Sequence, residues 1–210
     1  MMMRWQARRR RGSALAGGLL LGLTLAACGG GEKEEAAKKT VPATEVCDGL
    51  SPKAARALEQ VSETKRFEYR FYDGGAKALK DRLHDPDRRG GGDLPACVIE
   101  PDVADPDESP SRMTVSFEEV ERLPLPEPEG VALARLPVGL RAYGDDSGAD
   151  LWFACEVPGV GKPIVHAQLI YGPRPREKSP REANIRVLQD LSRRQALAMG
   201  CPDAGGIPSV

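Results

Sequence analysis

The sequence predicts an α+β domain, in which an antiparallel sheet of about five strands is covered on one face by helices and stapled by disulfides. Helix, strand and helix are followed by several strands and then by a final helix, an order typical of α+β folds. The expected strands either alternate apolar with polar residues or are continuously apolar. Four of the five cysteines lie within this region, and an even number favours disulfide bonds in an exported domain.

The first helix is expected to begin after Ser51. Ser51 is a good N-cap, and Pro52 suits the first helical position because its missing N–H has no helical partner there. Ala54, Leu58 and Val61 follow at spacings of four and three, so they share one face. This pattern predicts a short amphipathic helix.

Two further helices are expected. Residues 76–83 form a second short helix, and a third runs from Pro180 to Met199. Ser179 and Glu182 have the spacing of a capping box, Pro180 is expected at the first helical position, and Gly200 ends the helix.

Six short segments have strand character, of which 138–143 is the weakest. The last two are joined by the turn-forming residues 158–162 and predict a hairpin. These segments are residues 67–71, 96–99, 113–117, 138–143, 151–155 and 164–171.

The N-terminal region has the features of an export signal. Arginines at positions 4 and 8–11 form a basic leader without an acidic residue, and Ser13–Ala27 is uncharged and rich in leucine. About 20 apolar residues are needed to cross a bilayer as a helix. The run of fifteen residues is therefore a signal-peptide core, for which Sec and twin-arginine export both remain open.

The segment Leu25–Cys28 resembles the lipobox of bacterial lipoprotein signal peptides. A branched apolar residue, two alanines and a cysteine stand in the required order. The resemblance implies that lipid is attached to the Cys28 sulfur, with palmitate-type acyl chains, and that residues 1–27 are removed. The alternative is an ordinary secretory signal with a chance cysteine.

The chain is expected to have four parts. The signal peptide (1–27) is followed by a lipidated tether (28–45), in which glycine and charged residues predominate before Val41, then by a folded domain (46–203) and a short tail (204–210). We expect the protein on the extracytoplasmic face of the cell membrane.

Charge limits the partners. Residues 1–27 contain five of the 30 basic residues and no acid, so the mature chain has 25 basic against 31 acidic residues, a net charge of −6. Such a chain is a poor nucleic-acid binder. Its attachment to the membrane is expected to rest on the lipid, since two or three acyl chains bind essentially permanently.

The mature cysteines besides Cys28 are Cys47, Cys97, Cys155 and Cys201. Four cysteines allow three connectivities, of which we favour Cys47 with Cys97 and Cys155 with Cys201. The first bond would join the start of the first helix to a strand, and the second would join the end of the last helix to the hairpin. A zinc site is disfavoured because the cysteines stand 50, 58 and 46 residues apart, without a closely spaced pair.

From Cys47 onwards the layout resembles the short cell-surface lipoproteins of uncharacterised function in streptomycetes and other actinobacteria. The matching features are residues 47–50 before a helix, the strand cysteine Cys97, the aromatic strand 151–155, and a final helix ending at Cys201. The resemblance implies an extracytoplasmic compartment, disulfides and the α+β fold class. No activity comes with it.

Two histidines and an acidic loop are candidate sites. His166 lies in a strand on the side shared with Ile164, Gln168 and Ile170, where a structural role is favoured over that of a general base. His84 is explained by a favourable interaction with a helix C-terminus. The third candidate is read as a solvated loop, because the calcium-binding frame is absent; its acidic residues are Asp102, Asp105, Asp107 and Glu108.

Aromatic residues give the one candidate ligand site, a cleft between sheet and helix where an apolar molecule would bind. Such residues more often belong to the core. The candidates are Trp152, Phe153, Phe67, Tyr69 and Phe71, with His166 beside them.

The leading hypothesis is a non-enzymatic envelope lipoprotein that binds a small ligand or another envelope protein, without cofactor or metal. One alternative is a cell-wall-directed hydrolase using His166 with a carboxylate such as Asp150 or Glu156. Another is a purely structural envelope component.

We expect the mature protein to carry lipid on Cys28 and to contain no free thiol. Intact mass of the detergent-extracted protein, measured with and without reduction and alkylation, checks both. An unmodified Cys28 would contradict the anchor, and four thiols that alkylate without reduction would contradict the disulfides.

Overall fold

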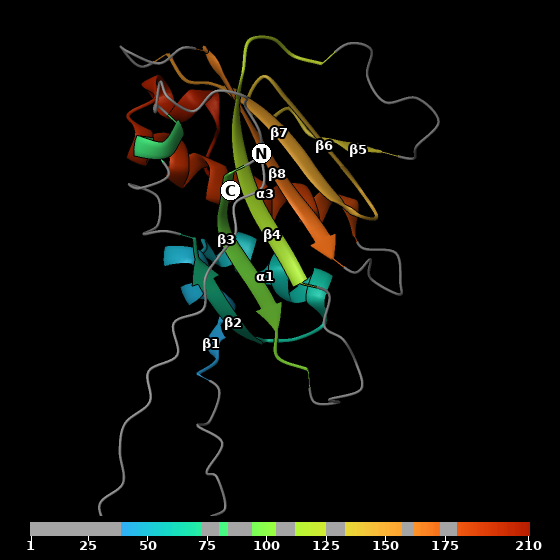
Figure 1. Ribbon diagram of the computed structural model, residues 1–210. Helices are drawn as coiled ribbons and strands as arrows, with labels where there is room; N and C mark the ends of the chain where they lie inside the picture. The colour runs from blue at the N-terminus through green and yellow to red at the C-terminus, as the bar shows by residue number, and fades with distance from the viewer. Residues whose placement is uncertain are drawn as a thin grey trace, which may run out of the picture. The chain divides into compact units, whose positions relative to one another are not determined.

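An eight-stranded antiparallel sheet, in the order β1-β2-β3-β4-β8-β7-β6-β5, is the framework of the computed structural model (Figure 1). The structure describes residues 39–72, 80–83, 94–103, 112–124, 133–156, 162–172 and 180–210. The strands are β1 (Val41–Pro42), β2 (Arg66–Phe71), β3 (Leu94–Pro101), β4 (Arg112–Val120), β5 (Ala134–Arg135), β6 (Arg141–Asp145), β7 (Gly148–Ala154) and β8 (Ile164–Gly172).

Both long helices lie on one side of this sheet. Helix α3 (Arg181–Met199) packs against β6, β7 and β8, and α1 (Pro52–Ser62) packs along α3 (Figure 1). Two 3₁₀ segments, η1 (Ala43–Asp48) and η2 (Pro202–Gly206), complete the described elements. The antiparallel sheet with helices therefore confirms the predicted fold class at this level.

Helix α1 begins as the sequence predicts. The Ser51 side chain accepts a hydrogen bond from the Ala54 amide at 3.3 Å, and Pro52 is the first helical residue. Ala54 and Leu58 are fully buried and Val61 nearly so. The second expected helix is described only over residues 80–83, which are helical.

Helix α3 starts one residue later than predicted. Pro180 is its N-cap rather than its first helical residue, and Ser179 lies outside the described residues. The end is as expected, because Gly200 adopts a left-handed conformation (φ 81°) and its amide bonds to the carbonyls of the last turn.

Polar contacts hold the start of α3 on the sheet. Arg181 makes two hydrogen bonds to the Asp146 carboxylate, at 2.8 and 3.2 Å, and this pairing raises the pKa of Arg181. The Tyr171 hydroxyl donates to Oδ1 of the fully buried Asn184 at 2.6 Å, and Asn184 Nδ2 donates to the Asp145 carbonyl at 3.0 Å. These bonds fix the position of the helix over β6–β8.

The strand count of about five is too low, since the sheet has eight strands. Two additional strands, β1 and β5, contain only two residues each, and a period of two cannot be detected in so short a segment. The weak strand expected at 138–143 is β6 at Arg141–Asp145, shifted towards the turn that leads into β7.

The folded region begins before the boundary set at residue 46. Val41 pairs with Phe67 in the sheet, and Ala43 is fully buried. The sequence suggests a tether because glycine and charged residues predominate before Val41, yet the few apolar side chains between residues 41 and 46 are enough to close one end of the core.

The tail from residue 204 is also part of the fold. Ala204 and Ile207 are buried, and Gln189 Nε2 donates to the Pro208 carbonyl at 2.9 Å. Gly205 has φ +67°, and a Cβ there would lie 2.6 Å from a ring carbon of Phe153. Only glycine fits this close approach to the sheet, which explains how so short a segment can pack.

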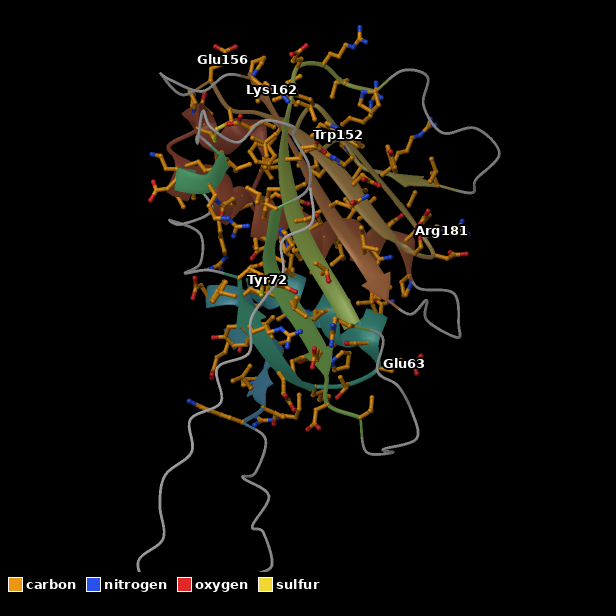
Figure 2. All side chains as sticks on the ribbon, viewed as in Figure 1. Glu63, Tyr72, Trp152, Glu156, Lys162 and Arg181 are labelled. Carbon is orange, nitrogen blue, oxygen red and sulfur yellow. A yellow bond between two sulfur atoms is a disulfide. The ribbon has the colours of Figure 1, made fainter. Side chains whose placement is uncertain are left out.

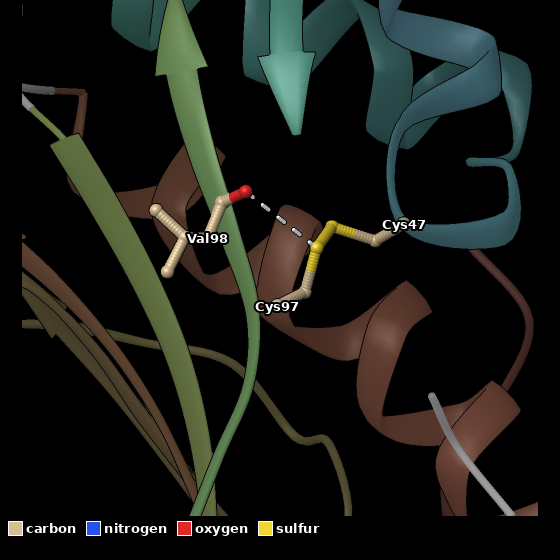
Figure 3. The surroundings of a disulfide bond; sticks show 3 residues. All are labelled: Cys47, Cys97 and Val98. Atoms are coloured by element: carbon tan, nitrogen blue, oxygen red, sulfur yellow. Dashed lines mark hydrogen bonds between the residues drawn. A yellow bond between two sulfur atoms is a disulfide. The ribbon is translucent and has the colours of Figure 1, made fainter. Parts of the chain in front are cut away.

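The two disulfides are Cys47–Cys97 and Cys155–Cys201, with Cα–Cα distances of 6.1 and 4.6 Å. The first joins η1 to β3 (Figure 3), and the second joins the residue after β7 to the residue after the helix-ending Gly200. In Figure 3 the Cys97 sulfur lies 3.9 Å from the Val98 carbonyl oxygen; a disulfide sulfur has no hydrogen to donate, so we treat this as a packing contact.

Removing either disulfide should destabilise the domain. Each bond joins residues 50 or 46 positions apart, and closing a loop of that size in the unfolded chain corresponds to about 4 kcal/mol. We expect the double variant Cys155→Ala/Cys201→Ala to lose roughly this much in denaturant unfolding. A loss no larger than that of a surface alanine substitution would contradict a stabilising role.

Candidate functional site

The sheet has a second face, opposite α3, that carries the candidate site. Along β8 the buried residues Val165, Ala167 and Leu169 face the helix, and the alternate residues face the other side. In the described part of the chain, no helix covers this second face. We refer to it as the open face.

A histidine–carboxylate pair lies on the open face. His166 Nε2 is 2.7 Å from Asp150 Oδ1, and Gln168 Nε2 donates to the same oxygen at 3.2 Å. The side chains of His166 and Asp150 are 14% and 21% exposed, so the pair is shielded but reachable. Because an ionised carboxylate only accepts, Nε2 carries the proton, and Nδ1 is the acceptor whenever the ring is neutral.

Trp152 forms the aromatic floor beside this pair. It pairs with His166 across β7 and β8, and their rings stack at 4.3 Å with an interplanar angle of 4°. Tyr143 packs on Trp152 at 5.3 Å. Trp152 is only 3% exposed although it lies on the open face. Its stacked ring and the Asp150 hydrogen bond together fix the His166 ring in one orientation.

A hollow of about 510 Å³ opens over this floor. Its walls come from the end of β4 and the following residues, and Arg141 Nη1 holds this wall by donating to the Pro124 carbonyl at 2.8 Å. Lys162, labelled in Figure 2, donates to the Glu119 carbonyl at 3.1 Å. The lining residues are Val120, Arg122, Leu123, Pro124, Trp152 and His166.

The hollow combines an apolar lining with two polar side chains, those of His166 and Arg122. Val120, Leu123 and Pro124 can contact an apolar part of a ligand, and His166 Nδ1 can accept a hydrogen bond or take up a proton. Glu118 is the register partner of His166 across β4 and β8. Arg122 adds a cation at the rim.

The structure brings together two of the six residues expected in an aromatic cleft. Trp152 and His166 line the hollow, whereas Phe67 and Phe153 are fully buried on the helix side. Tyr69 and Phe71 also face the helix side, where their rings pack edge to face at 5.7 Å.

The carboxylate candidates separate clearly. Asp150 contacts His166, and Glu156 is exposed beyond the end of β7. Asp102 is exposed and follows β3, while Asp105, Asp107, Glu108 and His84 lie outside the described residues.

Sequence reasoning missed Tyr143 and the residues 120–124 as part of the site. It placed Gln168 on the same side of the strand as His166, without giving it a role in the site. The others depend on the register of neighbouring strands, which only the folded sheet supplies.

Histidine, cysteine and carboxylate side chains do not gather in groups of three that could hold a metal ion within the described residues. Among the helices described, none combines the length and apolar composition needed to cross a bilayer.

Comparison of the chain with protein-family models, curated protein sequences and solved structures finds no match.

The stacked pair gives a direct optical test of the site. The sequence contains two tryptophans, Trp5 and Trp152, so a chain without residues 1–27 reports on Trp152 alone. The stacked His166 ring helps to keep Trp152 only 3% exposed, so His166→Ala should admit water to the indole and shift its emission to longer wavelength. Thr114→Ala, elsewhere on the open face, should leave the emission unchanged, and an unshifted maximum in His166→Ala would contradict the stacking.

Proposed function

We propose that this chain is a lipid-anchored extracytoplasmic protein of the bacterial envelope that binds a ligand or protein partner through the open face, without chemical turnover. Lipid on Cys28 holds it at the outer face of the cell membrane. In this proposal it is related in kind to the streptomycete-type lipoproteins that its layout resembles.

Two features support the compartment. Leu25–Cys28 has the residue types of a lipobox at each position. All four other cysteines are paired in two disulfides, and structural disulfides are typical of proteins that fold outside the cytosol.

The hollow over Trp152 and His166 is the observation that carries the binding proposal. Asp150 and Trp152 hold His166 in place before any ligand arrives, so little side-chain entropy remains to be lost on binding. An apolar lining with a few fixed polar groups is the usual composition of a ligand site. A protein partner could insert one side chain into the same hollow.

Site-specific photo-crosslinking tests this proposal in intact cells. A photo-crosslinking residue replaces Leu123 in the hollow, and a control carries it at Leu197, which is 54% exposed on α3. We expect a discrete adduct from position 123 only. The adduct should disappear in Val120→Arg, which fills the hollow, and persist in Thr114→Arg, on the same face six residues earlier along β4.

The outcomes separate the possibilities. Absence of an adduct from position 123, or an adduct unaffected by Val120→Arg, would contradict binding in the hollow. A partner captured equally from both positions would favour a purely structural envelope component. Release of the protein from membranes on fractionation, despite an intact Cys28, would contradict the anchor.

The contact between His166 and Asp150 supports one second candidate, a cell-wall-directed hydrolase. A histidine held by a carboxylate can act as a general base. The test is activity against a panel of wall glycans and peptides, with His166→Ala and Asp150→Asn compared with Thr114→Ala. Loss of general-base catalysis should lower turnover at least about a hundredfold. A fall of this size in both site variants, each shown to be folded, would favour the hydrolase over the binding protein.

A further inference from the structure

A second cavity, of about 140 Å³, lies on the helix side of the sheet, away from the open face. It is a half-open cavity between β2, β3 and β4 on one side and the second half of α3 on the other, with the Cys47–Cys97 disulfide in its wall. Its lining residues are Cys47, Asp48, Phe71, Ala96, Cys97, Val115, Phe117, Leu191, Arg194 and Gln195.

The course of α3 explains why space remains here. The helix packs on β6, β7 and β8, while η1 is held against β3 by the disulfide. Between these two contacts, the side chains of Val115 and Phe117 are buried but do not fill the gap.

The walls are chemically apolar. Phe71, Ala96 and Leu191 contribute hydrocarbon surface, and the disulfide is soft and uncharged. A cavity of comparable volume lined by aliphatic and aromatic groups stays dry and binds a molecule the size of benzene. The volume therefore suits one six-membered ring, and the apolar walls disfavour a sugar, whose hydroxyl groups would lose their hydrogen bonds to water.

One end of the cavity is polar. Arg194 is exposed there. Its Nε donates a hydrogen bond to Asp190 Oδ2 at 3.1 Å, and its Nη1 donates one to the Asp48 carbonyl at 3.2 Å. Its Nη2 has no partner among the described residues. Asp48 is exposed and also lines the cavity, and its backbone carbonyl lies at Arg194, so donor and acceptor groups occur in the same part of the wall.

We propose that this cavity binds a small aromatic molecule bearing a hydroxyl group, with the ring between β3, β4 and α3 and the hydroxyl at Arg194 and Asp48. A hydroxyl can accept from the guanidinium and donate to the carboxylate. A carboxylate in the same place would lie near both Asp48 and Asp190, whose two negative charges outnumber the single positive charge of Arg194. This site is separate from the open-face hollow and does not depend on the lipid anchor.

Calorimetric titration with phenol tests the proposal, using residues 28–210 with Cys28→Ser in detergent-free buffer. The chain from Lys38 to Val210 forms one compact unit, so loss of the leader leaves the cavity walls intact. We expect saturable binding with one phenol per chain. Benzoate, which carries the unfavourable charge, should bind at least tenfold more weakly.

Cavity-filling variants supply the controls. Ala96→Leu should weaken phenol binding at least tenfold, while Thr114→Leu, on the opposite face of the neighbouring strand β4, should change it less than twofold. Leu191→Phe fills the cavity from the helix side and gives the same test if Ala96→Leu fails to fold.

Each result has a defined consequence. Non-saturable binding of phenol, or equal binding by a folded cavity-filling variant and the wild type, would overturn the site. Equal affinities for phenol and benzoate would overturn the assignment of a hydroxyl ligand. Loss of phenol binding in Ala96→Leu with an unchanged photo-crosslink from position 123 would support two independent sites.

Discussion

The structure depends on one constraint: α3 covers a single face of strands β6–β8. Side chains alternate along a strand, so every strand beneath the helix places one half of its residues in the core and the other half on the open face. In β8, Val165, Ala167 and Leu169 form the core, while His166 and Gln168 reach Asp150 on the other side. A shift of one residue in register would exchange the two sets, bury the polar pair beneath α3 and expose the core.

Polar contacts and a covalent bond together prevent such a shift. The Tyr171–Asn184–Asp145 hydrogen bonds fix the start of α3 relative to β6 and β8, and Cys155–Cys201 fixes its end relative to β7. Asn184 is fully buried, so loss of either partner would leave an unsatisfied group in the core, which costs about 1–3 kcal/mol. The helix is therefore held at both ends. Because β7 and β8 pack against this fixed helix, the site residues on their opposite face are also held in place.

The sequence predicts features that are local and periodic. The cap of α1, the end of α3 and the parity of His166 with Gln168 follow from residue types and spacing. The cysteine count alone leaves three disulfide connectivities open, and the observed pairing is favoured only by the expected places of the helices and strands. The strands β1 and β5 do not, because two residues have no period. The aromatic residues could not be assigned to a face from the sequence. Alternation relates residues within one strand, but it does not show that Phe153 faces the helix while Trp152 faces Tyr143 and His166. The site joins His166 on β8 to Asp150 and Trp152 on β7, Val120 on β4 and Tyr143 on β6, so it exists only once the three registers between these strands are set.

The same alternation keeps the two candidate sites apart while they share a strand. In β4, Val115 and Phe117 line the cavity beside the disulfide, whereas Glu118 and Val120 lie on the open face next to the hollow. Substitutions that contact different neighbours and share no partner usually have additive effects. A coupling between Ala96→Leu and Val120→Arg would therefore require movement of the β4 backbone itself. Since β4 pairs with β3 and with β8 along its length, such movement is costly, and the sheet is expected to act as a rigid wall between an apolar cavity and a polar surface.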